Sequence, residues 1–102
     1  MEARIREEMF NLGILSNKKG YIYIIEAVKR FNSSITMEEI YNSIASTVGK
    51  SRCAVERSIR TAIKSANHDL SAWKNYDCLT ARGVITTMYY RCKESALSLI
   101  HI

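Results

Sequence analysis

Proline is absent from this chain of 102 residues, and glycine occurs only four times. Folds with many short strands need a turn residue at each reversal, so this scarcity argues against an all-β sandwich or barrel. Hydrophobic residues make up 47% of the chain and charged residues 25%, which is typical of a folded globular domain. We therefore expect a single all-α domain spanning residues 1–102.

The first third of the chain predicts two helices. Apolar residues at helical spacing predict a helix over residues 3–12, which Gly13 ends. The next segment begins like a strand, because residues 21–25 are aromatic or β-branched. Over residues 21–31, however, the larger apolar side chains recur at helical spacing: Tyr21, Ile24, Ile25, Val28 and Phe31. We expect a helix that is apolar nearly all round and therefore central and buried.

Residues 36–66 predict a helix-turn-helix. Thr36 and Glu39 have the spacing of a capping box, which would begin one helix. Gly49 ends that helix, and Ser51 can cap the next helix at once. The first helix has an apolar stripe of Met37, Ile40, Tyr41, Ile44, Ala45 and Val48, and the second has one of Val55, Ile59, Ala62, Ile63 and Ala66. A tight glycine turn between two short helices is typical of this motif, although plain helical hairpins share the pattern.

The last third predicts one or two more helices. Residues 70–76 are expected to form a short helix with Trp73 packed inward, and residues 81–100 a final helix. The apolar stripe of the final helix, which is more often core than a ligand site, consists of Val84, Ile85, Met88, Tyr89, Cys92, Ala96, Leu99 and Ile100. The expected fold therefore has five or six helices, with the helix-turn-helix packed on the central helix.

The positive charge is concentrated in the second helix of this motif. The chain carries a formal net charge of +5, and residues 50–64 hold one acidic side chain, Glu56, against five basic ones: Lys50, Arg52, Arg57, Arg60 and Lys64. At about 100° per residue, the apolar stripe faces away from Arg57, Arg60 and Lys64. Such a patch indicates a polyanion partner, or merely a solvated helix face. Charge alone leaves both interpretations open.

Two side chains near this patch have a simple and a more specific interpretation. Glu56 can pair with Arg60 at i, i+4, or it can orient Arg60 and accept from a cytosine amino group. Cys53 lies in the first turn of the basic helix, where a thiolate could be stabilised. No base or acid partner is evident for it, so we interpret Cys53 as a small residue beside a partner surface.

The sequence gives no sign of an enzyme. It lacks the phosphate-binding glycine loops, the zinc-protease motif and the nucleophile elbow. The acidic pair Glu7-Glu8 is most simply a solvated helix face. Cys53, Cys78 and Cys92 form neither a disulfide framework nor a zinc-binding pattern, so we expect reduced and mostly core-filling thiols. We expect no catalytic residue, no metal and no cofactor.

The N-terminal residues, the length of the apolar runs and the thiols predict where in the cell the chain is found. The N-terminal residues are charged and helical, unlike a signal peptide. No apolar run approaches the roughly 20 residues of a membrane span. With reduced thiols, these features predict a cytoplasmic protein without a membrane partner.

Several segments together resemble a known family. The chain contains Leu12-Gly13-Ile14, Lys19-Gly20-Tyr21-Ile22-Tyr23, Glu26-Ala27 and Val55-Glu56-Arg57-Ser58-Ile59-Arg60-Thr61-Ala62-Ile63. In this order and spacing they resemble the C-terminal effector domain of the sporulation-initiation response regulator of endospore-forming bacteria. The resemblance covers residues 10–66 and fades downstream, where Trp73 does not match the family pattern.

The resemblance implies a six-helix fold whose second motif helix enters the DNA major groove at boxes related to TGTCGAA. By position, Glu56, Arg57 and Arg60 match residues on the family's reading face. The family usually has Ser-Arg where this chain has Cys53-Ala54, so one reading arginine is missing. Losing one bidentate arginine typically costs about 1–3 kcal/mol of base discrimination, so we expect an altered or relaxed preference.

The family also has partners beyond a single DNA site. The resemblance implies homodimers on tandem boxes and contacts to an RNA polymerase sigma factor in the divergent downstream region. The phospho-accepting receiver domain has no counterpart in these residues. We therefore expect either an excised effector domain or a stand-alone relative that phosphorylation does not switch.

Our leading hypothesis is a transcription regulator that binds double-stranded DNA sequence-specifically. Its recognition helix would span about residues 52–66, and its DNA-binding residues would be Lys50, Ser51, Arg52, Glu56, Arg57, Arg60, Thr61 and Lys64. The alternative is a protein-interaction module of the same fold that has lost DNA reading and modulates a paralogous regulator. A weaker third hypothesis is a basic helical domain without a nucleic-acid role.

Overall fold

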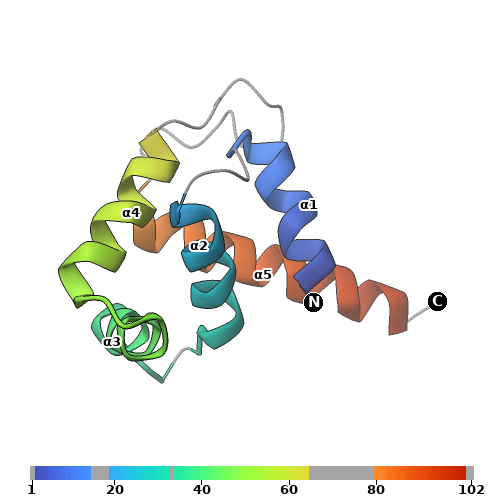
Figure 1. Cartoon of the computed structure of the whole chain (residues 1–102). Helices are drawn as coiled ribbons and strands as arrows, with labels where there is room; N and C mark the ends of the chain where they lie inside the picture. The colour runs from blue at the N-terminus through green and yellow to red at the C-terminus, as the bar shows by residue number, and fades with distance from the viewer. Residues whose placement is uncertain (1, 15–18, 33, 65–79, 101–102) are drawn as a thin grey trace.

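The computed structural model describes residues 2–14, 19–32, 34–64 and 80–100. Within these ranges the chain forms helices and no strand, which confirms the all-α prediction (Figure 1). The helices are α1 (Glu2–Leu12), α2 (Lys19–Arg30), α3 (Met37–Val48), α4 (Arg52–Lys64) and α5 (Ala81–Ile100). The short helix expected at 70–76, with Trp73, lies outside the described residues, as do Ala66 and Cys78.

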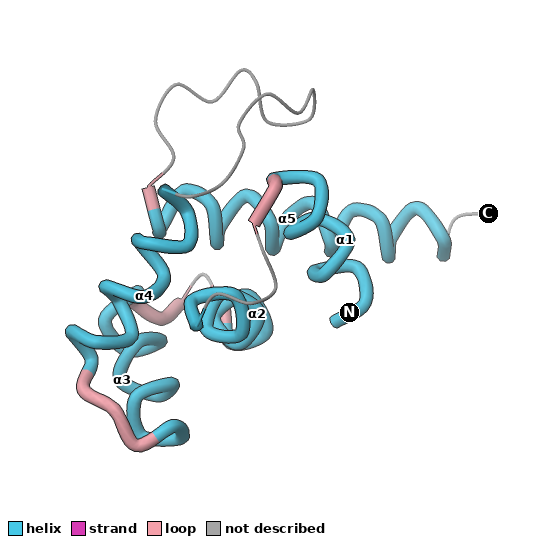
Figure 2. The backbone as a smooth tube through the Cα atoms, turned by 45° about the horizontal axis from the view of Figure 1, so that its top comes forward, coloured by secondary structure: helices cyan, strands magenta, loops and turns pink. Residues whose placement is uncertain are grey.

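Helix α2 is the centre of the fold, as its apolar pattern predicted. It contacts each of the other four helices (Figures 1 and 2), and it buries Tyr21, Ile24, Ile25 and Val28. The strand-like segment 21–25 is therefore helical. Burial of a whole helical face outweighs the local β-propensity of these residues. The helix is not buried on every side, however, because the apolar side chain of Ile22 is 46% exposed.

Helices α2 and α4 approach each other closely at Gly20. A Cβ atom on Gly20 would lie 2.1 Å from the carbonyl oxygen of Ser58 and 2.8 Å from the Cβ of Ala62. Such distances lie far inside van der Waals contact, so the backbones of the two helices touch here. Glycine at position 20 thereby sets how deeply α4 is seated.

Figure 2 shows the short turn that joins α3 to α4, and hydrogen bonds cap the ends of these two helices. Thr36 accepts a hydrogen bond from the Glu39 amide at the start of α3. Gly49 adopts the left-handed conformation at φ 70°, and the Lys50 amide donates to the carbonyl of Ala45. Ser51 Oγ accepts from the Ala54 amide, 3.1 Å away, at the start of α4. These contacts confirm the predicted helix-turn-helix, its glycine turn and the start of its second helix. The predicted end of the motif at residue 66 lies outside the described residues.

The end of the α3 stripe differs from the prediction. Ile40, Tyr41, Ile44 and Ala45 are buried, but Val48 is 36% exposed. Val48 lies in the last turn of α3, where the chain leaves the core to form the tight turn at Gly49. Helical periodicity correctly places Val48 on the apolar face of α3. It does not show that the neighbouring helices no longer cover this face at the last turn.

The acidic pair in α1 also differs from the prediction, because Glu8 is fully buried. Its carboxylate lies 2.9 Å from Arg4 Nη2 and accepts a hydrogen bond of 2.8 Å from Arg91 Nε. Arg91 belongs to α5, so this charged contact joins the first described helix to the last. Only Glu7, which is exposed, lies on a solvated face as expected.

Helix α5 packs across α1, α2 and α4. It buries Val84, Ile85, Met88 and Cys92, as the stripe predicted, whereas Tyr89 of the same stripe is only half-buried. The side chains of the last residues of that stripe lie outside the described part. Figure 1 shows the beginning of α5 beside α4 and its far end projecting beyond α1.

The contact at Gly20 generates a stability prediction. Gly20→Ala adds the Cβ atom that would overlap Ser58, so α4 must move away from α2. We expect a net loss of about 1–3 kcal/mol in the free energy of unfolding, even though alanine favours a helix. Urea unfolding of both chains measures this. A variant as stable as the native chain would show that the two backbones are not in contact.

Candidate nucleic-acid interface

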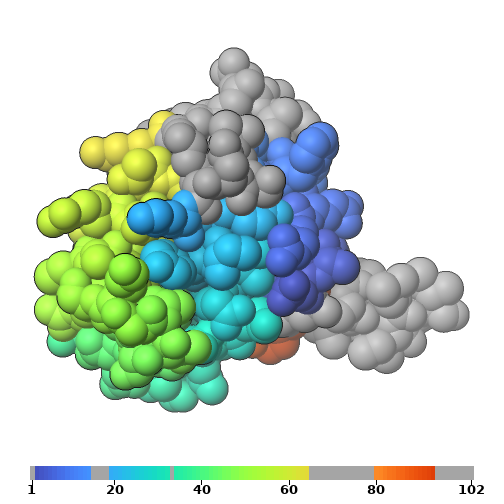
Figure 3. All heavy atoms as spheres, in the orientation of Figure 1, coloured from blue at the N-terminus to red at the C-terminus, as the bar shows by residue number. Residues whose placement is uncertain are grey.

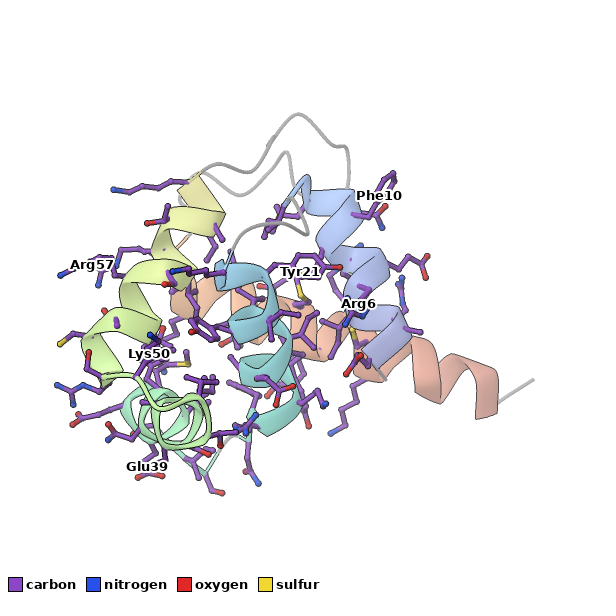
Figure 4. The ribbon with its side chains drawn as sticks, viewed as in Figure 1. Arg6, Phe10, Tyr21, Glu39, Lys50 and Arg57 are labelled. Carbon is purple, nitrogen blue, oxygen red and sulfur yellow. The ribbon has the colours of Figure 1, made fainter. Side chains whose placement is uncertain are left out.

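The outer face of α4 carries the predicted basic residues. Arg57, Arg60 and Lys64 are all exposed, and Arg57 points away from the body of the domain in Figure 4. The opposite face of α4 buries Val55, Ile59, Ala62 and Ile63 against the core. The predicted division of the helix into a core face and a cationic face is therefore confirmed.

Six side chains of α4 surround a shallow hollow of about 350 Å³ on this outer face. They are Cys53, Glu56, Arg57, Arg60, Thr61 and Lys64. Five of these are among the residues that the sequence predicted to bind DNA. The exposed surface of α4 forms the upper part of the left edge of the molecule in Figure 3, in yellow and yellow-green.

Some cations of this site form an ion pair within the domain, and others do not. Arg60 is ion-paired with Glu56 on the same helix, as the i, i+4 spacing predicted. Arg52 is ion-paired with Glu38 at the start of α3, which the sequence did not predict because the two residues lie on different helices. Within the described part of the chain, no ion pair is found for Lys50, Arg57 or Lys64. These three cations are therefore available to an external anion without breaking an internal contact.

Two of the predicted polar residues have distinct positions. Ser51 caps α4 through its side chain, so it has a structural role besides any contact with a ligand. Thr61 lies exposed on the outer face, in the hollow beside Arg57. Lys50, in the turn before α4, is also exposed. The eight predicted residues thus lie on α4 and on the turn that precedes it.

The two described cysteines occupy opposite environments. Cys53 is exposed in the first turn of α4, and Cys92 is buried in the core. Burial raises the pKa of the Cys92 thiol, and the nearby Glu8 carboxylate raises it further. Cys92 therefore fills the core, as expected, and Cys53 lies on the cationic face, beside the surface where the sequence placed it.

The described residues contain no group of three or more histidine, cysteine, aspartate or glutamate side chains placed to hold a metal ion. Among the same residues, no helix combines the length and apolar character needed to cross a membrane.

The fold and this face define a class of protein: a helix-turn-helix domain whose second helix presents cations to solvent. The sequence narrows the class further. The chain belongs to the family described as sporulation initiation factor Spo0A C terminal, whose family model matches residues 5–82. This family is the DNA-binding effector domain of a sporulation transcription regulator and not a known enzyme. The match confirms the resemblance and extends it beyond residues 10–66. Searches of curated proteins and of solved structures found no match.

The environments of the two cysteines generate a chemical test of how α4 is oriented. We expect a maleimide at pH 7 to modify Cys53 in the folded chain, while Cys92 reacts only after denaturation, because Cys92 is buried and its pKa is raised. Peptide mass spectrometry after timed quenching measures both sites. A Cys53 that in the folded chain reacts as slowly as buried Cys92 would show that α4 does not present this face to solvent.

Proposed function

We propose that this chain binds double-stranded DNA sequence-specifically, as a transcription regulator, by inserting α4 into the major groove. The observation that supports this most strongly is the row of exposed cations on α4. It lies on the helix that follows the glycine turn, in a family of DNA-binding domains. The major groove is wide enough for one α-helix, and the second helix of this motif is the one that enters it.

The residues of the row have different chemical roles in this proposal. Arg57 and Arg60 present forked guanidinium groups, which suit the O6 and N7 acceptors of guanine. The ion pair with Glu56 holds Arg60 in an orientation for such a contact, and the remaining carboxylate oxygen can accept from a cytosine amino group. Thr61 can contact either a base edge or a phosphate.

The residues around the row contact the sugar-phosphate backbone. Lys50 and Lys64 provide mobile charges for phosphates, and the Ser51 hydroxyl, which caps α4 by accepting from the Ala54 amide, can donate its hydrogen to the same backbone. Arg52 would share its guanidinium group between a phosphate and Glu38, whose carboxylate already offsets part of its charge. We therefore assign Arg52 a weaker contribution to affinity than Lys50 or Lys64.

The proposal separates base-reading residues from backbone-binding residues. Arg57→Ala should reduce discrimination between a duplex carrying TGTCGAA and a scrambled duplex by about 1–3 kcal/mol. Lys64→Ala should weaken binding to both duplexes equally and lower the slope of log K against log salt by about 0.9. Fluorescence-anisotropy titrations at several salt concentrations measure both effects. If the native chain binds neither duplex at low salt, the proposed function is wrong.

The position of Ala54 generates a second prediction. Ala54 is half-buried in the first turn of α4, where the family usually has arginine. Ala54→Arg should restore a base contact and raise discrimination for the family box by about 1–3 kcal/mol, which is roughly 5- to 150-fold. Ala54→Lys, which adds charge without a forked donor, is the matched control. If both variants gain only affinity that is independent of sequence, position 54 does not face the bases.

One observation favours a second candidate function: the chain has Cys53-Ala54 where the family usually has Ser-Arg. A domain that has lost base reading can act as an interaction module that modulates a paralogous regulator. In that case the chain would form a stable complex with a full-length paralogue, and neither duplex would be bound. Size-exclusion chromatography with and without DNA distinguishes this outcome from the first proposal.

Three further proposals rest on the family alone. We propose a cytoplasmic location, cooperative binding of two copies to tandem boxes, and contact with an RNA polymerase sigma factor. A duplex with two boxes should be bound more tightly per site than a duplex with one if the copies interact. Sedimentation of the complex with the two-box duplex measures this directly.

A further inference from the structure

We propose that the DNA-binding surface extends beyond the helix-turn-helix to Lys19, at the start of α2, and Arg82, at the start of α5. These two cations would bind the phosphate backbones on either side of the major groove that receives α4. The inference rests on the proposed function and adds two residues to it. The sequence did not predict either of them, because each is far from residues 50–64 along the chain.

Lys19 lies beside α4 on one side. Together with Gly20 it lines a groove of about 230 Å³, whose α4 side consists of Arg57, Ser58, Thr61 and Ala62. The groove exists because the backbones of α2 and α4 are in contact at Gly20. Figure 3 shows the beginning of α2, in blue, against the yellow-green surface of α4. The close packing therefore brings an exposed lysine next to Arg57, the proposed base-reading residue.

Arg82 lies beside α4 on another side. It lines a groove of about 500 Å³ together with Glu56, Arg60 and Lys64 of α4. Tyr41 and Met37 of α3, and Thr80 and Ala81 at the beginning of α5, complete this groove. Arg82 is exposed, so its guanidinium group can reach solvent on the same side as the α4 cations.

The two grooves flank α4 on opposite sides. They share no residue. At about 100° per residue, Glu56 and Arg60 fall on one side of the outward direction of Arg57, and Ser58 and Thr61 on the other. The residues of α4 thus run in order from one groove, across the outer face, to the second groove. Lys19 and Arg82 lie at the two edges of one continuous surface.

The spacing of packed helices suits contacts to both DNA strands. Neighbouring helix axes lie about 8–10 Å apart, and the major groove is about 12 Å wide between its phosphate walls. A helix in the groove therefore has a phosphate wall close to each of its flanks. Cations on the helices packed against those flanks, α2 and α5, lie within side-chain reach of the walls.

The positions of Lys19 and Arg82 are unfavourable for the isolated fold. Each lies in the first turn of its helix, without an acidic residue in that turn. The helix dipole favours an anion there, and a cation costs about 0.3–1 kcal/mol. Helix α3, by contrast, begins with Glu38 and Glu39. Among the described residues, neither Lys19 nor Arg82 forms an ion pair. A phosphate would offset the charge and the dipole at both positions.

The test is charge removal at both positions with DNA binding and stability measured together. Lys19→Gln and Arg82→Gln, alone and combined, remove the charge and keep a polar side chain that a helix accepts. Lys93→Gln is the control, because Lys93 is an exposed cation on the same side of α5, three turns further from α4. Anisotropy titrations use the TGTCGAA duplex and the scrambled duplex from about 50 to 200 mM salt.

We expect each single variant to lower the salt slope by about 0.9 and the double variant by about twice that. At 0.1 M salt each change should weaken binding to both duplexes by the same factor, about 5- to 10-fold. The thermal midpoints should stay equal to that of the native chain or rise, which a merely structural role would not produce. Lys93→Gln should leave the salt slope unchanged.

Two outcomes would overturn the inference. If the native chain binds both duplexes with a steep salt slope and the double variant binds identically, Lys19 and Arg82 do not contact DNA, while the proposed function stands. A native chain that binds no duplex at 50 mM salt overturns both the proposed function and this extension.

Discussion

The contact between Gly20 of α2 and Ser58 of α4 is the constraint on which the rest of the domain depends. Because the two backbones touch, α4 is seated against the central helix at Ser58 and Ala62, and its apolar face is buried in the core. Its opposite face is then fully directed outward, and that face carries the cations. A side chain at position 20 would move α4 and separate Lys19 from Arg57. The same contact therefore determines both the stability of the core and the shape of the proposed DNA surface.

Charged side chains serve different purposes in different parts of this domain. In the core, buried Glu8 is held by Arg4 of its own helix and Arg91 of α5, which joins the two ends of the described chain. Such a contact defines which helices meet, since removing one partner would leave a buried charge unpaired. On α4, the exposed pair of Glu56 and Arg60 contributes little to stability and mainly restricts where the guanidinium group points.

The sequence predicted most of the fold because its signals are local. Helical spacing, the cap at Thr36, the glycine at 49 and the cap at Ser51 each act within a few residues, and each is confirmed. The cationic face of α4 could be predicted for the same reason. The burial of Glu8 could not, because its partner Arg91 lies 83 residues away. Nor could the Arg52–Glu38 pair or the position of Lys19 beside Arg57 be predicted, since both depend on how helices pack.

The central claim is that α4, flanked by the beginnings of α2 and α5, is the surface that meets DNA. Amide chemical-shift mapping of the isotope-labelled chain, titrated with the TGTCGAA duplex, tests this most directly. The account predicts shifts along α4, at residues 19–20 and at residues 80–82, with α1 and residues 90–93 of α5 unchanged. Shifts confined to α1 and the later turns of α5, with α4 unchanged, would contradict it.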